Sequence, residues 1–192
     1  MQPLVLGSTS PYRRQLLEKL ALTFVTAAPD CDERARTGEA PAALVERLSE
    51  AKARSVAEQY PDGLIIGSDQ VAVLDDSIVG KPRDRTAAIA QLRAASGRTV
   101  RFLTGLCLYN AATDRAQRSV EPFSVAFREL EDDEIERYLD HEAPYDCAGS
   151  FRSEGYGITL ARALEGRDPN TLIGLPLIAL SAMLRKEGVR LP

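Results

Sequence analysis

The clearest signal of an α/β fold is one apolar run that ends in polar residues, Leu64-Ile65-Ile66-Gly67-Ser68-Asp69-Gln70. The apolar part is typical of a buried strand, and open α/β sheets bind ligands beyond the carboxyl ends of their strands. Asp69 therefore stands where a carboxylate can bind a metal or orient a water molecule. It can also simply open the following turn, and the residues alone leave both interpretations open.

Strand-like and helix-like segments alternate on both sides of this run, with no internal repeat, which predicts an α/β fold in one domain over residues 1–192. The expected strands cover residues 4–7, 24–27, 64–68, 71–74, 77–79, 100–109 and 120–127. The expected helices begin at Pro11 and otherwise cover residues 41–59, 87–95, 131–140 and 176–186. Residues 147–170 have weak periodicity, which is typical of loops that carry function.

The composition is that of an ordinary globular protein, with 192 residues, 44% hydrophobic and 27% charged. Its three cysteines, Cys31, Cys107 and Cys147, show no CxxC spacing, so neither a disulfide framework nor a zinc site is expected. No signal peptide and no membrane-spanning run is recognisable. These features predict a cytoplasmic protein without a membrane partner.

The charges exclude some functional classes. The net charge is −4, so no overall basic field exists to hold nucleic acid or anionic lipid. The single histidine, His141, lies in a charged stretch and is expected at the surface, which disfavours catalytic triads and HExxH zinc sites. A metal would then have oxygen ligands, as Mg²⁺ or Mn²⁺ prefers.

The first expected helix has an unusual start. Ser8-Thr9-Ser10 precedes Pro11, with Ser10 as N-cap, and Arg13 and Arg14 place two cations where the helix dipole disfavours them. Arg14 can pair with Glu18, whereas Arg13 lies on the inward face and is free to meet an anion such as a phosphate. The alternative is that this segment is only a cap.

Three further features are ambiguous on their own. Lys52 falls on the apolar stripe of its helix, where it either snorkels to the edge or enters a cleft. Lys81, in Gly80-Lys81-Pro82, adds a cation but belongs to no phosphate-loop pattern. The acidic loop Asp30, Asp32 and Glu33 either supplies a metal ligand or is simply solvated.

Taken together, these motifs resemble the Maf family of nucleotide pyrophosphatases over nearly the whole chain. The matching stretches are LVLGSTSPYRR (4–14), Asp32-Glu33, Lys52 in SEAKA, IGSDQ (66–70) and Gly80-Lys81-Pro82. The later stretches CAGSFRSEGYG (147–157), EGRDPNTL (165–172) and IGLPL (173–177) resemble the branch that prefers 7-methyl-GTP.

The resemblance implies a divalent-metal-dependent enzyme, with Mg²⁺ or Mn²⁺, that hydrolyses a nucleoside triphosphate to a monophosphate and pyrophosphate and removes modified nucleotides. It implies an elongated mixed β-sheet flanked by helices, with two lobes around a central nucleotide-binding cleft. The family's substrate-binding positions match Ser8, Arg13, Lys52 and Lys81. Its catalytic aspartate matches Asp69, its metal site matches Glu33 and Asp69, and its base-selecting positions match Tyr12, Gln70 and Glu154.

Two other functions remain open from the sequence. The branch of the same family that acts on dTTP and UTP would share the chemistry but not the base-reading residues. A nucleotide-binding regulator of cell division would bind without turnover, although Asp69 beside three cations favours an enzyme. The sequence also leaves a homodimer open as the assembly.

Overall fold

The computed structural model describes residues 2–192 and shows an α/β chain with a mixed seven-stranded sheet. The strand order is β2-β1-β3-β5-β6-β7, with β4 paired to β3. The strands are β1 (Leu4–Gly7), β2 (Val25–Ala27), β3 (Leu64–Leu74), β4 (Ser77–Val79), β5 (Thr99–Asn110), β6 (Arg115–Phe127) and β7 (Ala161–Gly166). β1 is parallel to β2 and β3, whereas the pairs β3–β4 and β6–β7 are antiparallel. The expected fold class is confirmed.

Six α-helices accompany the sheet in the described part of the chain. They are α1 (Pro11–Glu18), α2 (Pro41–Ser55), α3 (Arg85–Ala95), α4 (Asp132–Glu142), α5 (Asn170–Ile173) and α6 (Leu177–Lys186). Short 3₁₀ helices cover Ala57–Gln59, Ala148–Ser150 and Tyr156–Leu160. None of the helices in residues 2–192 combines the length and the apolar character that crossing a bilayer requires.

The chain divides into two compact units. The first unit comprises the chain up to Asp69, Thr104–Glu121 and Gly174–Pro192, and the second comprises Gln70–Leu103 and Pro122–Ile173. The strands β3, β5 and β6 each contribute residues to both units. A single domain over residues 1–192 and a cleft for a nucleotide stay predictions.

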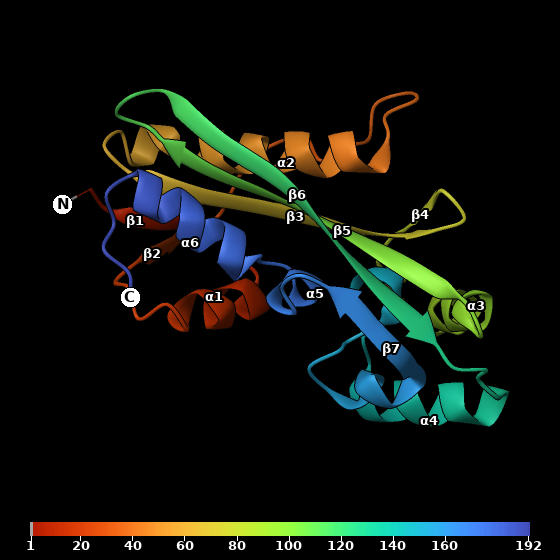
Figure 1. Ribbon diagram of the computed structural model, residues 1–192. Coiled ribbons are helices and arrows are strands. Elements are labelled where there is room, and N and C mark those ends of the chain that lie inside the picture. Colours follow the sequence, from red (N-terminus) through yellow and green to blue (C-terminus); the bar gives the residue numbers. More distant parts are fainter. Residues whose placement is uncertain (1) are drawn as a thin grey trace. The chain divides into compact units, whose positions relative to one another are not determined.

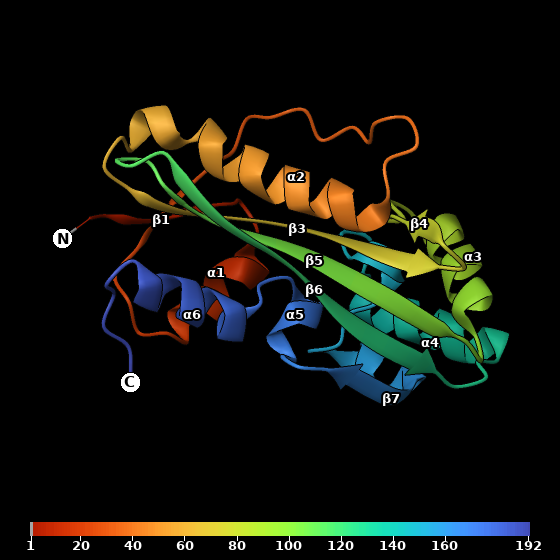
Figure 2. The ribbon, with the colours of Figure 1, turned by 45° about the horizontal axis from the view of Figure 1, so that its top comes forward.

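In the first unit, α2 covers one face of the strands, and α1 and α6 cover the other (Figures 1 and 2). Helix α2 lies very close to the sheet because glycines face it. A Cβ on Gly67 would stand 2.0 Å from the carbonyl oxygen of Ser49, and one on Gly105 would stand 2.1 Å from that of Val45. The missing side chains thus allow the helix backbone to rest directly on β3 and β5.

The second unit has its own aromatic core. Phe151 packs against Phe102 and Phe127, with ring centroids 6.2 and 5.1 Å apart, and Tyr138 is fully buried nearby. Helices α3 and α4 pack against each other in this unit. The surface prediction for His141 is confirmed, since it is exposed in the last turn of α4 with its ring 4.8 Å from that of Tyr156.

The structure corrects three details of the expected elements. Residues 64–68 and 71–74 form one continuous strand, because Asp69 and Gln70 stay extended instead of turning. The segment 147–170, expected as loop, contains β7 on the edge of the sheet next to β6. The expected helix over 41–59 ends at Ser55 and continues as a 3₁₀ turn. All three cysteines are free, as expected.

Candidate functional site

The candidate site begins where β1 ends. β1 pairs with β3 as far as Leu6 opposite Ile66, so β3 continues past it and carries Asp69 beyond the end of its neighbour. The buried Ser8 follows β1 directly, and its Oγ accepts a hydrogen bond from the Ser10 N–H at 3.1 Å. Ser8 therefore lies at the carboxyl end of its strand, where open α/β sheets bind ligands, whereas Asp69 lies within β3, past the point where β1 ends.

The start of α1 is capped as the sequence predicts. Ser10 is the N-cap, its Oγ accepts the Arg13 N–H at 3.3 Å, and Pro11 is the first helical residue. Arg14 makes the expected exposed ion pair with Glu18 at 3.3 Å. Ser10 is thus confirmed as the N-cap, and the cap uses the backbone N–H of Arg13 and not its side chain.

Helix α2 delivers Lys52 into the interior. Lys52 is 7% exposed and lies on the same stripe as the buried Leu48 and Val56, so its ammonium enters the protein rather than snorkelling outward. Helix α2 packs closely on Gly67 of β3, which lies two residues before Asp69. This packing brings the side of α2 that carries Lys52 close to Asp69. Burying an ammonium requires compensation by opposite charge.

That compensation comes from two carboxylates. Lys52 Nζ donates to Asp69 Oδ1 at 2.7 Å and to Glu33 Oε2 at 2.9 Å. Asp69 is 9% exposed, whereas the side chain of Glu33 is 57% exposed. The structure therefore joins three residues that the sequence singled out separately, one from each of α2, β3 and the polar loop 28–40.

The loop 28–40 is fastened along α2 in antiparallel direction. The Asp30 N–H donates to Ser55 Oγ, Glu33 meets Lys52, and Arg47 Nη2 donates to the carbonyl oxygen of Arg34 at 3.0 Å. Successive loop residues therefore contact α2 at positions that lie progressively closer to its N-terminus. These contacts explain why an exposed polar loop holds Glu33 in a defined place.

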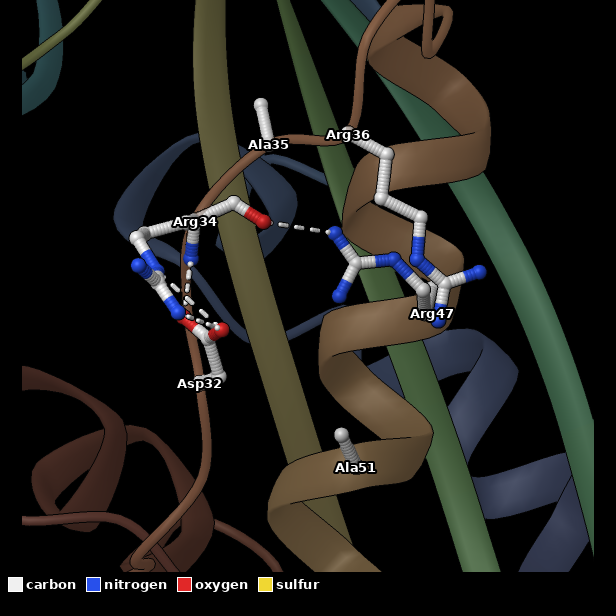
Figure 3. A pocket seen from close by; sticks show the side chains of 6 residues that line it. All are labelled: Asp32, Arg34, Ala35, Arg36, Arg47 and Ala51. Carbon is white, nitrogen blue, oxygen red and sulfur yellow. Dashed lines mark hydrogen bonds and ion pairs between the residues drawn. The ribbon is translucent and has the colours of Figure 1, made fainter.

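Arginines concentrate where this loop crosses α2. Arg34 pairs with Asp32 through both carboxylate oxygens, and Arg47 pairs with Glu39 in the same way, at 2.6 and 2.7 Å. Figure 3 shows Arg34, Arg36 and Arg47 around one pocket of about 480 Å³ that also includes Asp32, Ala35 and Ala51. The paired arginines hold the pKa of Glu39 at about 2 and lower that of Asp32.

Arg13 is a second, half-buried cation of the first unit. Its Nε donates to the carbonyl oxygen of Gly174 at 2.9 Å. Burial lowers the pKa of Arg13, while the negative charges of Asp69 and Glu33 raise it. An arginine stays protonated in proteins, so Arg13 is a cation held near the same two carboxylates.

Cys31 reports the same electrostatic environment. Burial raises the pKa of its thiol, the charge of Lys52 lowers it, and the charges of Glu33 and Asp69 raise it further. The thiol is therefore kept protonated beside the cluster. The sequence offered no sign of this placement, because Cys31 lies in an otherwise polar loop.

Glu33 and Asp69 are the residues that fit a divalent metal. Residues 2–192 contain no cluster of three or more histidine, cysteine, aspartate or glutamate side chains that could form a complete protein cage. Mg²⁺ is commonly held by one or two carboxylates together with substrate phosphates, and this pair meets that requirement. The two carboxylates converge on the ammonium of Lys52, which shows that both can approach one cation.

The other residues predicted for the nucleotide site lie in different parts of the two units. Tyr12 is half-buried on α1 of the first unit. In the second unit, Gln70 donates from Nε2 to the carbonyl oxygens of Thr171 and Leu172, at 2.8 and 3.1 Å. In that unit also, Lys81 is exposed, and Glu154 lies 3.5 Å from Arg152 Nε and accepts the Ser153 hydroxyl at 3.3 Å. Their assignment to a nucleotide site stays a prediction.

Comparison with known proteins decides the family. The sequence model of one family, described as Maf-like protein, matches residues 3–187. The chain belongs to the Maf family. The Maf match spans both compact units and includes every residue of the predicted site.

A curated Maf relative is also closely similar. A protein of Alcanivorax borkumensis named 7-methyl-GTP pyrophosphatase is 59% identical over 189 residues, which is 98% of this chain and 96% of that protein. The similarity to this Maf relative therefore extends over nearly all of both chains.

Proposed function

We propose that this member of the Maf family is a nucleoside triphosphate pyrophosphatase that converts 7-methyl-GTP to 7-methyl-GMP and pyrophosphate. The observation that carries the proposal is the cluster of Lys52, Asp69 and Glu33, in a chain that matches a protein named for this reaction. A buried carboxylate that is ion-paired with Lys52 and acts electrostatically on Arg13 is suited to activating water beside a polyphosphate.

The chain's own residues divide the work as follows. Arg13 and Lys52 neutralise the phosphates, and the buried Ser8 contributes its hydroxyl beside them. Asp69 orients the attacking water and accepts its proton, while the water oxygen bonds to the α-phosphorus and pyrophosphate leaves with the bridging oxygen. Lys52 orders Asp69 and Glu33 before substrate arrives, because it hydrogen-bonds to both.

Glu33 and Asp69 would hold Mg²⁺ or Mn²⁺ together with the substrate phosphates. Such an ion, when bound, draws negative charge from the phosphate oxygens and so supplements Arg13 and Lys52. Lys81 is proposed as a further phosphate ligand on the grounds of its sequence motif.

Base recognition is assigned to Tyr12, Gln70 and Glu154. N7-methylated guanine carries a positive charge, which favours stacking on an electron-rich ring such as that of Tyr12 and proximity to the carboxylate of Glu154. A glutamate can also accept hydrogen bonds from the guanine N1–H and amino group. In this proposal the enzyme removes modified nucleotides in the cytoplasm.

The test incubates the purified chain and Mg²⁺ or Mn²⁺ with equal concentrations of 7-methyl-GTP, GTP, UTP and dTTP, and resolves the nucleotide and phosphate products. We expect the fastest conversion with 7-methyl-GTP, giving the monophosphate and pyrophosphate. Faster turnover of UTP and dTTP would keep the reaction but refute the base assignments. Binding without turnover of any of the four would favour the regulator.

A further inference from the structure

Ser68 precedes Asp69 on β3 and is fully buried on the opposite face of the strand. Its Oγ lies 2.9 Å from the carbonyl oxygen of Gly105 on β5 and 2.9 Å from that of Gly174. A hydroxyl carries one hydrogen, so Ser68 donates to one of these carbonyls at a time or shares the hydrogen between them. The hydroxyl thereby links β3 to β5 and to the segment that precedes α6.

The carbonyl of Gly174 has a second donor, the Nε–H of Arg13, also at 2.9 Å. Gly174 adopts φ +121°, a conformation that side chains with a Cβ rarely take, and a Cβ there would stand 3.4 Å from Arg13 Nε. The backbone at Gly174 is thus shaped to present its carbonyl to Arg13, and Ser68 donates to the same oxygen.

This arrangement fixes the arginine by one of its five N–H groups. Among the residues described, no hydrogen bond to the protein engages the terminal nitrogens of Arg13, while the charges of Asp69 and Glu33 act on it. A guanidinium held at Nε keeps both terminal nitrogens for planar, two-point recognition of a phosphate. Its orientation decides whether those nitrogens meet the phosphate.

We propose that Ser68 is a positioning residue, whose hydroxyl holds the Gly174 carbonyl in place and thereby orients the Arg13 guanidinium toward the substrate phosphates. The part of this inference that concerns substrate rests on the proposed function. The part that concerns Arg13 is a property of the chain itself and is measured without any ligand.

The chain provides a matched control in Ser49. Ser49 is also fully buried in the first unit, and its hydroxyl also donates to a backbone carbonyl, that of Glu46 at 2.7 Å. That carbonyl lies within α2, so Ser49 shares the burial and chemistry of Ser68 without the link to Arg13. Ser49→Ala therefore measures what the loss of a buried serine hydroxyl does by itself.

The first measurement is the ¹H–¹⁵N signal of the Arg13 Nε–H in the full chain without ligand, assigned by its disappearance in Arg13→Lys. We expect Ser68→Ala to shift this signal and Ser49→Ala to leave it in place. Ser68→Cys, which has similar size and is a weak donor, should shift it in the same direction and serves if Ser68→Ala does not fold. An unchanged Arg13 signal in both Ser68 variants would overturn the proposal.

The second measurement is steady-state hydrolysis of 7-methyl-GTP. Ser68→Ala should raise KM about three- to tenfold, the usual effect of one hydrogen bond, with a smaller change in kcat, whereas Ser49→Ala should change neither. In an Arg13→Lys background, which lacks the Nε–H, Ser68→Ala should change KM less than about twofold because the link no longer exists. Equal effects of Ser68→Ala in both backgrounds would overturn the proposal.

The two measurements separate the two hypotheses. A wild-type chain that hydrolyses no triphosphate refutes the proposed function, while the Arg13 signal still decides whether Ser68 orients Arg13. An active enzyme whose Arg13 signal shifts in Ser68→Ala without any change in KM refutes the positioning role and leaves the proposed function standing.

Discussion

Asp69 combines burial, a fixed cation and a place beyond the end of β1, and no other carboxylate in the described residues of the first unit does so. We expect Asp69→Asn to reduce turnover of 7-methyl-GTP by about 10²- to 10⁴-fold, because asparagine cannot accept a proton from water. The measurement is product release at saturating metal, with circular dichroism as the check on folding.

Asp114→Asn is the matched control for this change. Asp114 also belongs to the first unit and pairs with Arg54 at 2.7 Å, but its side chain is 77% exposed. This variant should keep wild-type turnover. Activity of Asp69→Asn within about tenfold of wild type would contradict the role given to Asp69, since a positioned base contributes more than that.

Among single residues, the sequence identified the charged groups but not their partners. Lys52 stood out because a lysine on an apolar stripe breaks the helical pattern, and the structure confirms that it is buried. Its pairing with Glu33 and Asp69, 19 and 17 residues away, depends on how a loop and a strand pack on α2. Nothing in the sequence indicated a role for Ser68 or Gly174 in orienting Arg13. A serine in a strand and a glycine two residues before a proline are both common.

The close packing of α2 on the sheet requires Gly67 and Gly105, which have no side chain between the helix and the strands. We expect Gly67→Ala to lower the free energy of unfolding by about 3 kcal/mol or more, because its Cβ would lie 2.0 Å from the Ser49 carbonyl oxygen, which is backbone and cannot swing away. Displacing α2 would also displace Lys52, so turnover should fall as well. Urea unfolding measures the first effect.

Gly80→Ala is the comparison for stability. A Cβ on Gly80 would meet nothing within 4 Å, and its φ is not in the left-handed region. Its unfolding free energy should stay within about 0.5 kcal/mol of wild type, as for other surface substitutions. An equally small change in unfolding free energy for Gly67→Ala would contradict the close packing of α2 on β3.

The loop 28–40 is fastened by ion pairs that titrate in acid. Hydrogen bonds from Arg47 lower the pKa of Glu39 from 4.5 to about 2. Because the folded state binds this proton less readily, the pair stabilises the fold above pH 4.5, and that contribution is lost as pH falls towards 2. The stability difference between wild type and Glu39→Gln should therefore be largest above pH 4.5 and shrink towards pH 2.

Urea unfolding of both proteins at several pH values between 2 and 7 checks this expectation. The difference between the two proteins isolates Glu39 from the other carboxylates that titrate in the same range. A difference that grows as the pH falls would contradict the sign derived from the lowered pKa, and with it the bidentate pair on Arg47.

Most elements were predictable from local patterns, and the exceptions share a cause. Residues 64–74 read as two short strands because Asp69 and Gln70 are polar, yet Asp69 is bound by Lys52 and Gln70 donates to two carbonyls. Long-range partners thus stabilise an extended chain that the local sequence disfavours. β7 was missed because it lies on an edge with mostly exposed residues, so it lacks the apolar alternation of a half-buried strand.

At the level of the whole chain, the net charge of −4 disfavours binding of polyanions such as nucleic acid. Nonspecific binding to nucleic acid comes from neutralising phosphates with many cations. In the arginine-lined pocket of Figure 3, two of the three arginines are already paired with carboxylates. We therefore expect no binding to duplex DNA at physiological salt.

Fluorescence anisotropy of a labelled duplex, titrated with the chain up to about 100 µM, tests this expectation at the weak limit of ordinary nonspecific affinity. Saturable binding whose affinity falls steeply with salt would show a basic surface that the charge balance does not reveal. If DNA did bind and a mononucleotide displaced it, the DNA would be bound at the predicted phosphate site of Arg13 and Lys52.

The amino-acid sequence was sufficient for the fold class, the family, the N-cap of α1 and the identity of the charged residues, because these depend on local patterns and short motifs. The pairing of Lys52 with Asp69 and Glu33, and the link from Ser68 through Gly174 to Arg13, arise only in three dimensions. They join segments up to 161 residues apart, and the contacts that bring such segments together are set by packing of the whole sheet and its helices rather than by any local pattern.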